Sequence, residues 1–259
     1  MKLRAVPIKK RIQTSGIVAI LVTLFLFATR FANLDIARFV SRFGNFRRVL
    51  PHFLQINTAM ILPGLRELTI SFAMGVLGLV IGGVFAFFLA FLAADNIAPF
   101  KPLGIFIKTL ASLIRAIPSL VLLLVIVAAI GLGYRTGVMG LAFSSFGYLT
   151  KAFIATIEEQ DGDIIIAMRA TGANWGQIVV HGLMPAVITG FLAWIALRLE
   201  TSIAESISLG VVGAGGIGAL LARAIRQFDY GTISTLIIII FTAMFALELA
   251  MNRVRKALR

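Results

Sequence analysis

The chain has 259 residues, of which 59% are hydrophobic and only 14% carry a charge. Its mean hydropathy is +1.00, whereas soluble domains are about 45–50% apolar and about 25% charged. The composition therefore excludes an ordinary soluble domain and favours an integral membrane protein. The formal net charge of +13 then suits basic residues that fix the orientation of membrane helices, and we expect no nucleic acid partner.

The same composition limits metal and redox chemistry. The chain has no cysteine and two histidines, His52 and His181, which lie far apart in the sequence. The absence of cysteine excludes disulfide scaffolds, thiolate nucleophiles and cysteine-ligated zinc or iron–sulfur centres. We therefore expect no metal site and no self-contained redox chemistry in this chain.

Six apolar stretches are long enough to cross a membrane, since a helical span needs roughly 20 mostly apolar residues. In chain order they cover residues 15–32, 68–94, 103–133, 137–157, 185 to about 205, and 233–250. The third stretch is interrupted by Arg115 and Pro118. Each is expected to be a helix, because a backbone exposed to lipid must satisfy its own hydrogen bonds. The sequence thus predicts an all-α membrane protein with about six transmembrane helices.

The first stretch follows a basic segment that has no acidic residue, which is also typical of a signal peptide. No small-x-small cleavage site follows it, so we expect a retained span. An even number of crossings puts both termini on one side of the membrane. Both termini are basic, with Lys2, Arg4, Lys9, Lys10 and Arg11 at one end and Arg253, Arg255, Lys256 and Arg259 at the other. The positive-inside rule makes that side cytoplasmic.

Residues 33–66 disagree with this orientation, because they would lie outside yet carry five arginines: Arg38, Arg42, Arg47, Arg48 and Arg66. Their mixture of basic and aromatic side chains would suit a short helix on the outer interface. We therefore divide the chain into two parts. Residues 1–66 hold the N-terminal tail, the first span and this interfacial segment, and residues 67–259 form the membrane core.

The longest polar connection covers residues 158–184, on the side predicted to be cytoplasmic. Four acidic residues at its start suit a helix N-terminus, and Gly172 is placed to end that helix. A second short helix, residues 174–180, then leads to Pro185. We expect a compact knob of two short helices with Trp175 at its tip, as an anchor for a protein interface. On spacing alone, the alternative is a solvated connector with an ordinary interfacial tryptophan.

This connection resembles the cytoplasmic loop of binding-protein-dependent ABC importer permeases. Ala167, Gly172 and Pro185 reproduce the loop motif Glu-Ala-Ala, three residues, Gly, nine residues, Ile-x-Leu-Pro. Residues 167–173 are especially similar to the phosphonate and phosphite importer permeases, and residues 113–119, 129–133 and 209–218 resemble segments of that family in the same order. The chain departs from the motif at Ile166, Gly182 and Met184, which replace its Glu, Ile and Leu. The lost glutamate removes one contact with the ATPase, for which the acidic residues just upstream could substitute.

The resemblance implies a type I ABC importer permease (MetI-like) fold in a bacterial inner membrane. It also implies that the loop is a coupling helix seated in a separate ATPase subunit. The residues that it assigns to coupling are Ala167, Met168, Arg169, Ala170, Thr171, Gly172, Ala173, Asn174, Trp175 and Pro185. The implied partners are a second permease copy or homologue, two ATP-binding subunits and an extracytoplasmic solute-binding protein.

The resemblance further implies that ATP and Mg²⁺ are bound by the partner subunits and not by this chain. The sequence agrees, because it contains no Gly-x4-Gly-Lys-Ser/Thr loop to cradle ATP phosphates. The implied solute is phosphonate or a related phosphorus oxyanion. Another small solute, such as methionine, is the alternative.

A glycine cluster follows the fifth stretch and consists of Gly210, Gly213, Gly215, Gly216 and Gly218. Residues 213–218 fit the Gly-x-Gly-x-x-Gly pattern of dinucleotide-binding folds, but that pattern has meaning only between a strand and a helix. Because a membrane helix precedes it here, we set nucleotide binding aside. Two interpretations stay open: a bend, re-entrant turn or gate that needs backbone freedom, and a helix packing cluster. We interpret Gly78 and Gly82 as simple helix packing.

The fifth stretch also carries charges, each of which costs at least about 2.5–3.5 kcal/mol at the centre of a membrane helix. Arg198 and Glu205 are seven residues apart on one helical face, whereas Glu200 points elsewhere. With Ser202 they predict a translocation pathway, and the alternative is a structural ion pair. A competing function is a secondary carrier driven by an ion gradient through Glu200, Glu205 or Glu248, against which stand the long loop and the lack of inverted repeats.

Overall fold

A computed structural model describes residues 8–32 and 36–257 of the chain. All regular elements in this part are helical, and the described residues include no strand. Five helices are long and apolar enough to cross a membrane, and one bent pair of helices would make a sixth span. The predicted all-α membrane fold with about six spans is therefore confirmed. The basic residues Lys2, Arg4 and Arg259 lie outside the described residues.

The structure divides into two compact units, Met1–His52 and Phe53–Arg259. The first unit contains helices α1 (Ile8–Phe31) and α2 (Ile36–Val49). Within this unit, the described side chains of the α1 span are mostly exposed. Helix α2 is the short helix predicted after the first span, and its Arg38, Arg42 and Arg47 are exposed.

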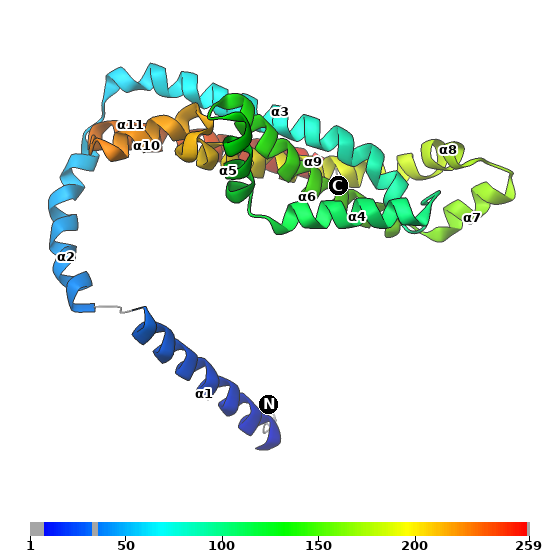
Figure 1. Cartoon of the computed structure of the whole chain (residues 1–259), viewed down its shortest axis with the longest axis horizontal. Coiled ribbons are helices and arrows are strands. Elements are labelled where there is room, and N and C mark those ends of the chain that lie inside the picture. Colours follow the sequence, from blue (N-terminus) through cyan, green and yellow to red (C-terminus); the bar gives the residue numbers. More distant parts are fainter. Residues whose placement is uncertain (1–7, 33–35, 258–259) are drawn as a thin grey trace. The chain divides into compact units, whose positions relative to one another are not determined.

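The second unit is built around three long helices, α3 (Ile61–Ala93), α6 (Tyr134–Glu158) and α9 (Met184–Leu209), which pack against one another (Figure 1). Gly78 and Gly82 let α3 approach α6 closely, because an added Cβ on either residue would overlap the backbone or Cβ atoms of α6. The packing role predicted for these two glycines is thus confirmed. A third side of this core is covered by α11 (Tyr230–Ala257), which contacts both α9 and α3.

Residues 53–66, which we grouped with the N-terminal part, pack with this second unit. They include the end of η1 (Leu50–Leu54), the 3₁₀ turn η2 (Thr58–Met60) and the start of α3. The backbone N–H of Asn57 donates to Thr235 Oγ1 at 2.9 Å, and the Asn57 side chain donates to Thr232 Oγ1 at 3.0 Å. These bonds fasten the segment to the first turns of α11.

The third span is broken where the sequence predicts an interruption. Helix α4 (Lys101–Ala116) and helix α5 (Ser119–Ile130) meet at an angle of 94°. Ile117 is extended, with φ −84° and ψ 123°, because the ring of the following Pro118 disfavours helical backbone at the residue before it. The break leaves Arg115 in the last turn of α4.

The fifth span is longer than expected, because helical structure runs from Trp175 to the kink at Gly213. Helix α8 (Trp175–Gln177) passes through the π-helix η3 (Ile178–Leu183) into α9, and α9 passes into a second π-helix, η4 (Gly210–Ala214). A further helix that the sequence analysis did not predict, α10 (Gly216–Arg226), then packs back against α9 and α3.

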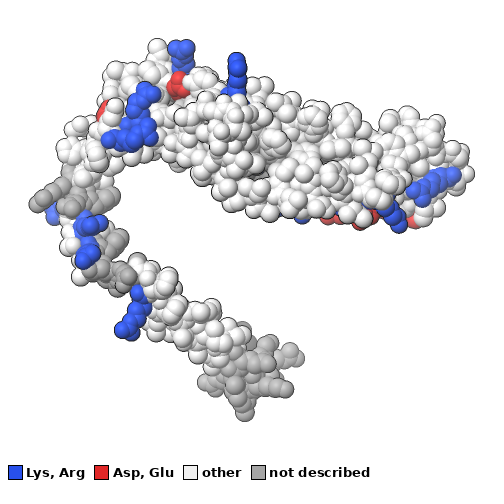
Figure 2. Space-filling view, viewed as in Figure 1, with Lys and Arg blue, Asp and Glu red and all other residues white. Residues whose placement is uncertain are grey.

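Charged side chains of the second unit gather at its two ends, whereas the stretch between them is largely uncharged on the face shown in Figure 2. At one end lie α10 and the start of α11, and at the other lie α7 (Gly162–Ala170) and α8 (Figure 1). At the α7 end, Lys108 Nζ bridges Asp95 at 2.7 Å and Glu158 at 2.8 Å. This distribution is that of a bundle whose middle lies in hydrocarbon.

Candidate functional site

Residues 158–184 fold into a hairpin of two helical segments, which we call the 158–184 hairpin. Its first segment is α7, whose N-cap Asp161 accepts a hydrogen bond from the Asp163 N–H. The helix ends in a Schellman motif, in which the Gly172 N–H donates to Arg169 O and the Ala173 N–H donates to Met168 O. Gly172 has φ +80°, a conformation that glycine adopts without strain. The predicted helix stop at Gly172 is confirmed.

The second segment begins with a capping box. The Asn174 side chain accepts from the Gln177 N–H at 2.9 Å, and the Gln177 side chain accepts from the Asn174 N–H at 2.8 Å. The second helical stretch predicted over residues 174–180 is present as α8 and the start of η3, and η3 then continues into α9 without a break. Gly182 on η3 lies against α7, where an added Cβ would meet Ile164 and Met168 at an ordinary contact distance of 3.4 Å.

Trp175 does not lie at the tip of the hairpin, so that expectation was wrong. Its indole N–H donates to the Ile97 carbonyl, 2.9 Å away in the α3–α4 connection. The reason is that Trp175 is the first residue of α8, beside the core, whereas the turn of the hairpin is made by Thr171, Gly172 and Ala173. Trp175 therefore ties the hairpin to the rest of the chain, with 39% of its surface exposed.

The residues assigned to coupling divide into two groups in the structure. Those exposed on the hairpin or at its root are Ala167, Arg169, Ala170, Thr171, Gly172, Asn174, Trp175 and Pro185, whereas Met168 and Ala173 are half-buried. Ile166, which replaces the glutamate of the motif, is 65% exposed. The hairpin thus presents an apolar side chain beside Arg169, surrounded by small residues.

The charges of α9 form a buried network. Arg198 is 4% exposed, and its Nη1 and Nη2 donate to the two carboxylate oxygens of Glu205 at 3.1 and 2.9 Å. Its Nε donates to Ser145 Oγ at 3.1 Å, and Nη2 also donates to Ser144 Oγ at 3.0 Å. The pairing follows from the seven-residue spacing of Arg198 and Glu205 on one helical face.

This network borders a cavity of about 200 Å³ between α4, α5, α6 and α9. Its lining is Ile114, Arg115, Ile117, Pro118, Ser119, Ser144, Tyr148, Arg198 and Glu205. The guanidinium carbons of Arg115 and Arg198 both lie near the Tyr148 ring, 5.4 and 5.6 Å from its centroid. Our predicted pathway set included neither Arg115 nor Tyr148. The sequence did contain one indication that Arg115 lines a cavity: it lies three residues before Pro118 in an otherwise apolar stretch.

The other two residues of the predicted pathway lie elsewhere. Glu200 accepts a hydrogen bond from Arg255 Nη2 of α11 at 2.8 Å. Ser202 is fully buried and donates to the Gly75 carbonyl of α3 at 3.1 Å. Of the four residues, the structure brings together only Arg198 and Glu205 at the cavity.

The glycine cluster makes the turn between α9 and α10. Gly213, Gly215 and Gly216 have φ of +114°, +91° and +70°, which fits the interpretation of a bend. Gly210 and Gly218 face each other so closely that an added Cβ on Gly210 would lie 3.0 Å from Gly218 Cα, which fits the packing interpretation. The turn is bonded to the α5–α6 connection, because the Gly133 N–H donates to Gly213 O at 3.1 Å.

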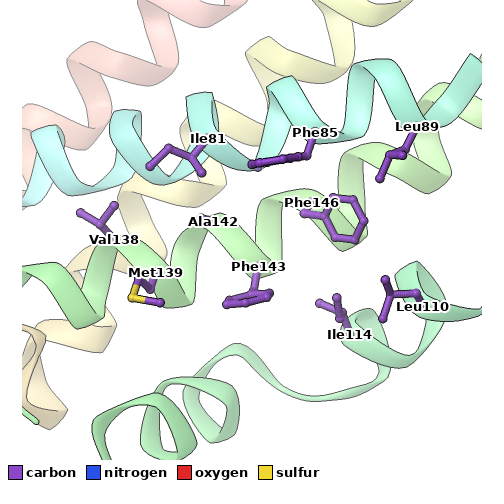
Figure 3. A pocket seen from close by; sticks show the side chains of 11 residues that line it. Ile81, Phe85, Leu89, Leu110, Ile114, Val138, Met139, Ala142, Phe143 and Phe146 are labelled. Atoms are coloured by element: carbon purple, nitrogen blue, oxygen red, sulfur yellow. The ribbon is translucent and has the colours of Figure 1, made fainter. Parts of the chain in front are cut away.

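A larger cavity of about 430 Å³ lies between α3, α4 and α6 and is lined by hydrocarbon (Figure 3). Phe85, Phe143 and Phe146 contribute aromatic rings, and Ile114 lines both this cavity and the polar one. Nothing in this lining could neutralise a charged solute. Within the described part of the chain, no group of three or more histidine or acidic side chains could hold a metal ion.

Comparisons with known proteins agree with this architecture. Residues 86–259 match the family described as "binding-protein-dependent transport system inner membrane component". The chain is 32% identical over 192 residues to the phosphite transport system permease protein PtxC of Stutzerimonas stutzeri, which covers 74% of this chain and 70% of that protein. It is also 32% identical over 185 residues to the phosphate-import permease protein PhnE of Mycolicibacterium smegmatis, over 71% of this chain and 35% of that relative, so it spans about a third of that protein's length.

Among solved structures, a chain of the inward-facing MetNI methionine ABC transporter aligns with a TM-score of 0.66. The identity is 22%, and the alignment covers 79% of this chain and 100% of the MetNI chain. This likeness confirms the MetI-like fold. The family match covers more than half of the chain and extends from α3 to its C-terminal residue. The chain therefore belongs to the family of binding-protein-dependent transport system inner membrane components, and it is an ABC importer permease, not an enzyme.

Proposed function

We propose that this permease translocates phosphonate or a related phosphorus oxyanion, driven by ATP hydrolysis in separate subunits that act on the 158–184 hairpin. The observation that carries the coupling role is the hairpin itself, which exposes Ile166 and Arg169 while Trp175 anchors it to the α3–α4 connection. An exposed apolar side chain on a protruding, internally bonded hairpin suits docking into a groove of another protein. The solute class is supported by the names of the phosphite and phosphate permeases to which the chain is similar.

The remaining parts of the assembly follow from the same proposal. ATP and Mg²⁺ are bound by two partner ATPase subunits, a second permease copy or homologue completes the pathway, and a solute-binding protein delivers the solute. The hairpin and both termini face the cytoplasm. Movement of the ATPases displaces the hairpin, and α9 carries that displacement into the membrane, which is a gating role rather than a chemical one.

The competing secondary carrier needs acidic groups that can take up and release a proton or a sodium ion within the membrane. Glu205 is paired with Arg198, and Glu200 is paired with Arg255. Each carboxylate is therefore already held by an arginine of the same chain, which leaves it less available to bind a transported cation. The ion pairs therefore favour the ATP-driven function.

The test is to purify the full chain with its candidate ATPase subunit and to measure uptake of radiolabelled phosphonate and phosphite in cells. We expect the ATPase to co-elute, and uptake to be abolished by vanadate but not by an ionophore. Ile166→Arg and Gly172→Arg should abolish uptake while the protein still inserts in the membrane. The matched control is Ile225→Arg, an exposed position on α10 at the opposite end of the unit.

Two results would refute the proposal. Full uptake by both hairpin variants would show that the hairpin does not couple ATP hydrolysis to transport. Uptake by the chain alone, insensitive to vanadate and abolished by an ionophore, would establish the secondary carrier instead.

A further inference from the structure

The polar cavity holds an arginine whose charge is not neutralised within the described part of the chain. Arg115 lies in the last turn of α4 and lines the cavity, and its guanidinium contacts the Tyr148 ring. Among the described residues, no carboxylate lies within ion-pair distance of it. Arg115 is exposed, and an unpaired cation beside hydrocarbon needs a counter-charge or water, so this position is suited to an anion that enters the cavity.

The charge balance of the lining supports the same conclusion. The lining contains two cations, Arg115 and Arg198, and one anion, Glu205. Arg198 donates to both carboxylate oxygens of Glu205, so the negative charge of Glu205 neutralises that of Arg198. The lining therefore carries a net charge of about +1, located at Arg115.

The cavity also offers hydroxyl donors and sufficient space. Ser119 and Ser144 line it, and Ser119 lies in the first turn of α5, which no side chain caps. Free N–H groups of that turn add to the positive character of the cavity. Its volume of about 200 Å³ compares with roughly 30 Å³ for one molecule of liquid water, so a small anion fits with part of its hydration shell.

We propose that this cavity binds one small tetrahedral oxyanion during transit, with Arg115 as the cation that receives it. The Arg198–Glu205 pair forms another part of the lining and is hydrogen-bonded to Ser144, and both guanidinium groups lie over the Tyr148 ring. Arginine suits this role because its planar fork can donate two hydrogen bonds to one oxyanion. The proposal rests on the proposed function for the chemical class of the solute, and it adds the residues that recognise it.

The test uses the full chain, purified and reconstituted in lipid nanodiscs, with methylphosphonate and phosphite as probes. Phosphorus-31 line broadening reports weak binding, and neutral dimethyl methylphosphonate controls for non-specific contact. We expect the wild-type chain to broaden the anion signals, and Arg115→Gln to weaken binding at least tenfold. Arg115→Lys should retain part of the binding, since it keeps the charge but loses the fork. The control Arg135→Gln, an exposed arginine in the first turn of α6, should bind as the wild type does.

Two results would overturn the site. One is unchanged anion binding by Arg115→Gln, and the other is equal broadening of the signal of the neutral ester. Circular dichroism and size-exclusion chromatography of each variant show whether it is folded. If Arg115→Gln does not fold, the comparison of Arg115→Lys with the wild type still decides the test.

The site and the proposed function fail in different ways. If uptake is vanadate-sensitive but the wild-type chain broadens no probe signal, the site is refuted and the importer stands. If the anions bind through Arg115 but no ATPase subunit co-elutes, the proposed coupling to an ATPase is refuted and the site stands.

Discussion

Replacement of Glu205 by glutamine tests how much of the membrane core's stability depends on the ion pair with Arg198. The Arg198 side chain is 4% exposed, and it donates to both carboxylate oxygens at 3.1 and 2.9 Å. Glutamine keeps one acceptor oxygen but turns an amide donor toward the guanidinium, so two donors face each other. Breaking a buried ion pair costs about 3–5 kcal/mol. Because 28% of the Glu205 side chain is exposed, we expect a loss near the lower limit, about 3 kcal/mol.

The assay is equilibrium unfolding of the full chain in mixed micelles, followed by circular dichroism, for a double-mutant cycle. The cycle comprises Glu205→Gln, Arg198→Gln and the two changes together. If the residues stabilise the fold as a pair, the double variant should be more stable than the sum of the single losses predicts, by at least about 1.5 kcal/mol. The reasoning is refuted if Glu205→Gln unfolds like the wild type, or if the two losses simply add.

Gly82→Ala should destabilise the chain by about 1–3 kcal/mol, because an added Cβ would lie 2.7 Å from the Phe146 backbone nitrogen of α6. Gly83→Ala is the matched control: its Cβ would meet only the end of the Leu149 side chain at 3.3 Å, so equal losses in the same unfolding assay would contradict the packing argument. In the connection before α11, hydrogen bonds from the Thr232 hydroxyl and backbone N–H lower the pKa of the Asp229 carboxyl. A lowered folded-state pKa adds stability above the unfolded value of about 3.9, which is lost as the pH falls through the folded pKa. Acid titration of the melting temperature should therefore show a smaller loss for Asp229→Asn than for the wild type, and parallel curves would exclude this contribution.

The membrane spans could be predicted from the sequence because each one needs a continuous stretch of apolar residues. A helix must bury about 30 Å of apolar length, so composition alone located α1, α3, α6 and α11, and Pro118 located the break between α4 and α5. The helix end at Gly172 was equally predictable. A glycine that follows a helical stretch favours the left-handed backbone conformation that ends a helix. These features depend on residues close together in the chain.

The features that sequence reasoning missed depend on which helix faces meet. Helix α10 begins with glycines and carries Arg223 and Arg226 near its end, so it reads as a loop, but packing on α3, α9 and α11 stabilises it as a helix. The partner of Trp175 is a carbonyl 78 residues away. The contacts of Arg115 and Arg198 with the Tyr148 ring likewise depend on how α4 and α9 lie against α6.

The π-helical turns η3 and η4 lie at opposite ends of α9, and this arrangement has a mechanical consequence. A π-turn is a common place for a helix kink, and η4 also contains the non-helical Gly213, whereas the 26 residues of α9 between the two turns form regular helix. A push on the hairpin end would therefore tilt α9 as one stiff lever, with flexing concentrated at the two joints. The Gly213 carbonyl, at the α10 end of α9, accepts the hydrogen bond from the Gly133 N–H. Each tilt of α9 would therefore strain or break that hydrogen bond.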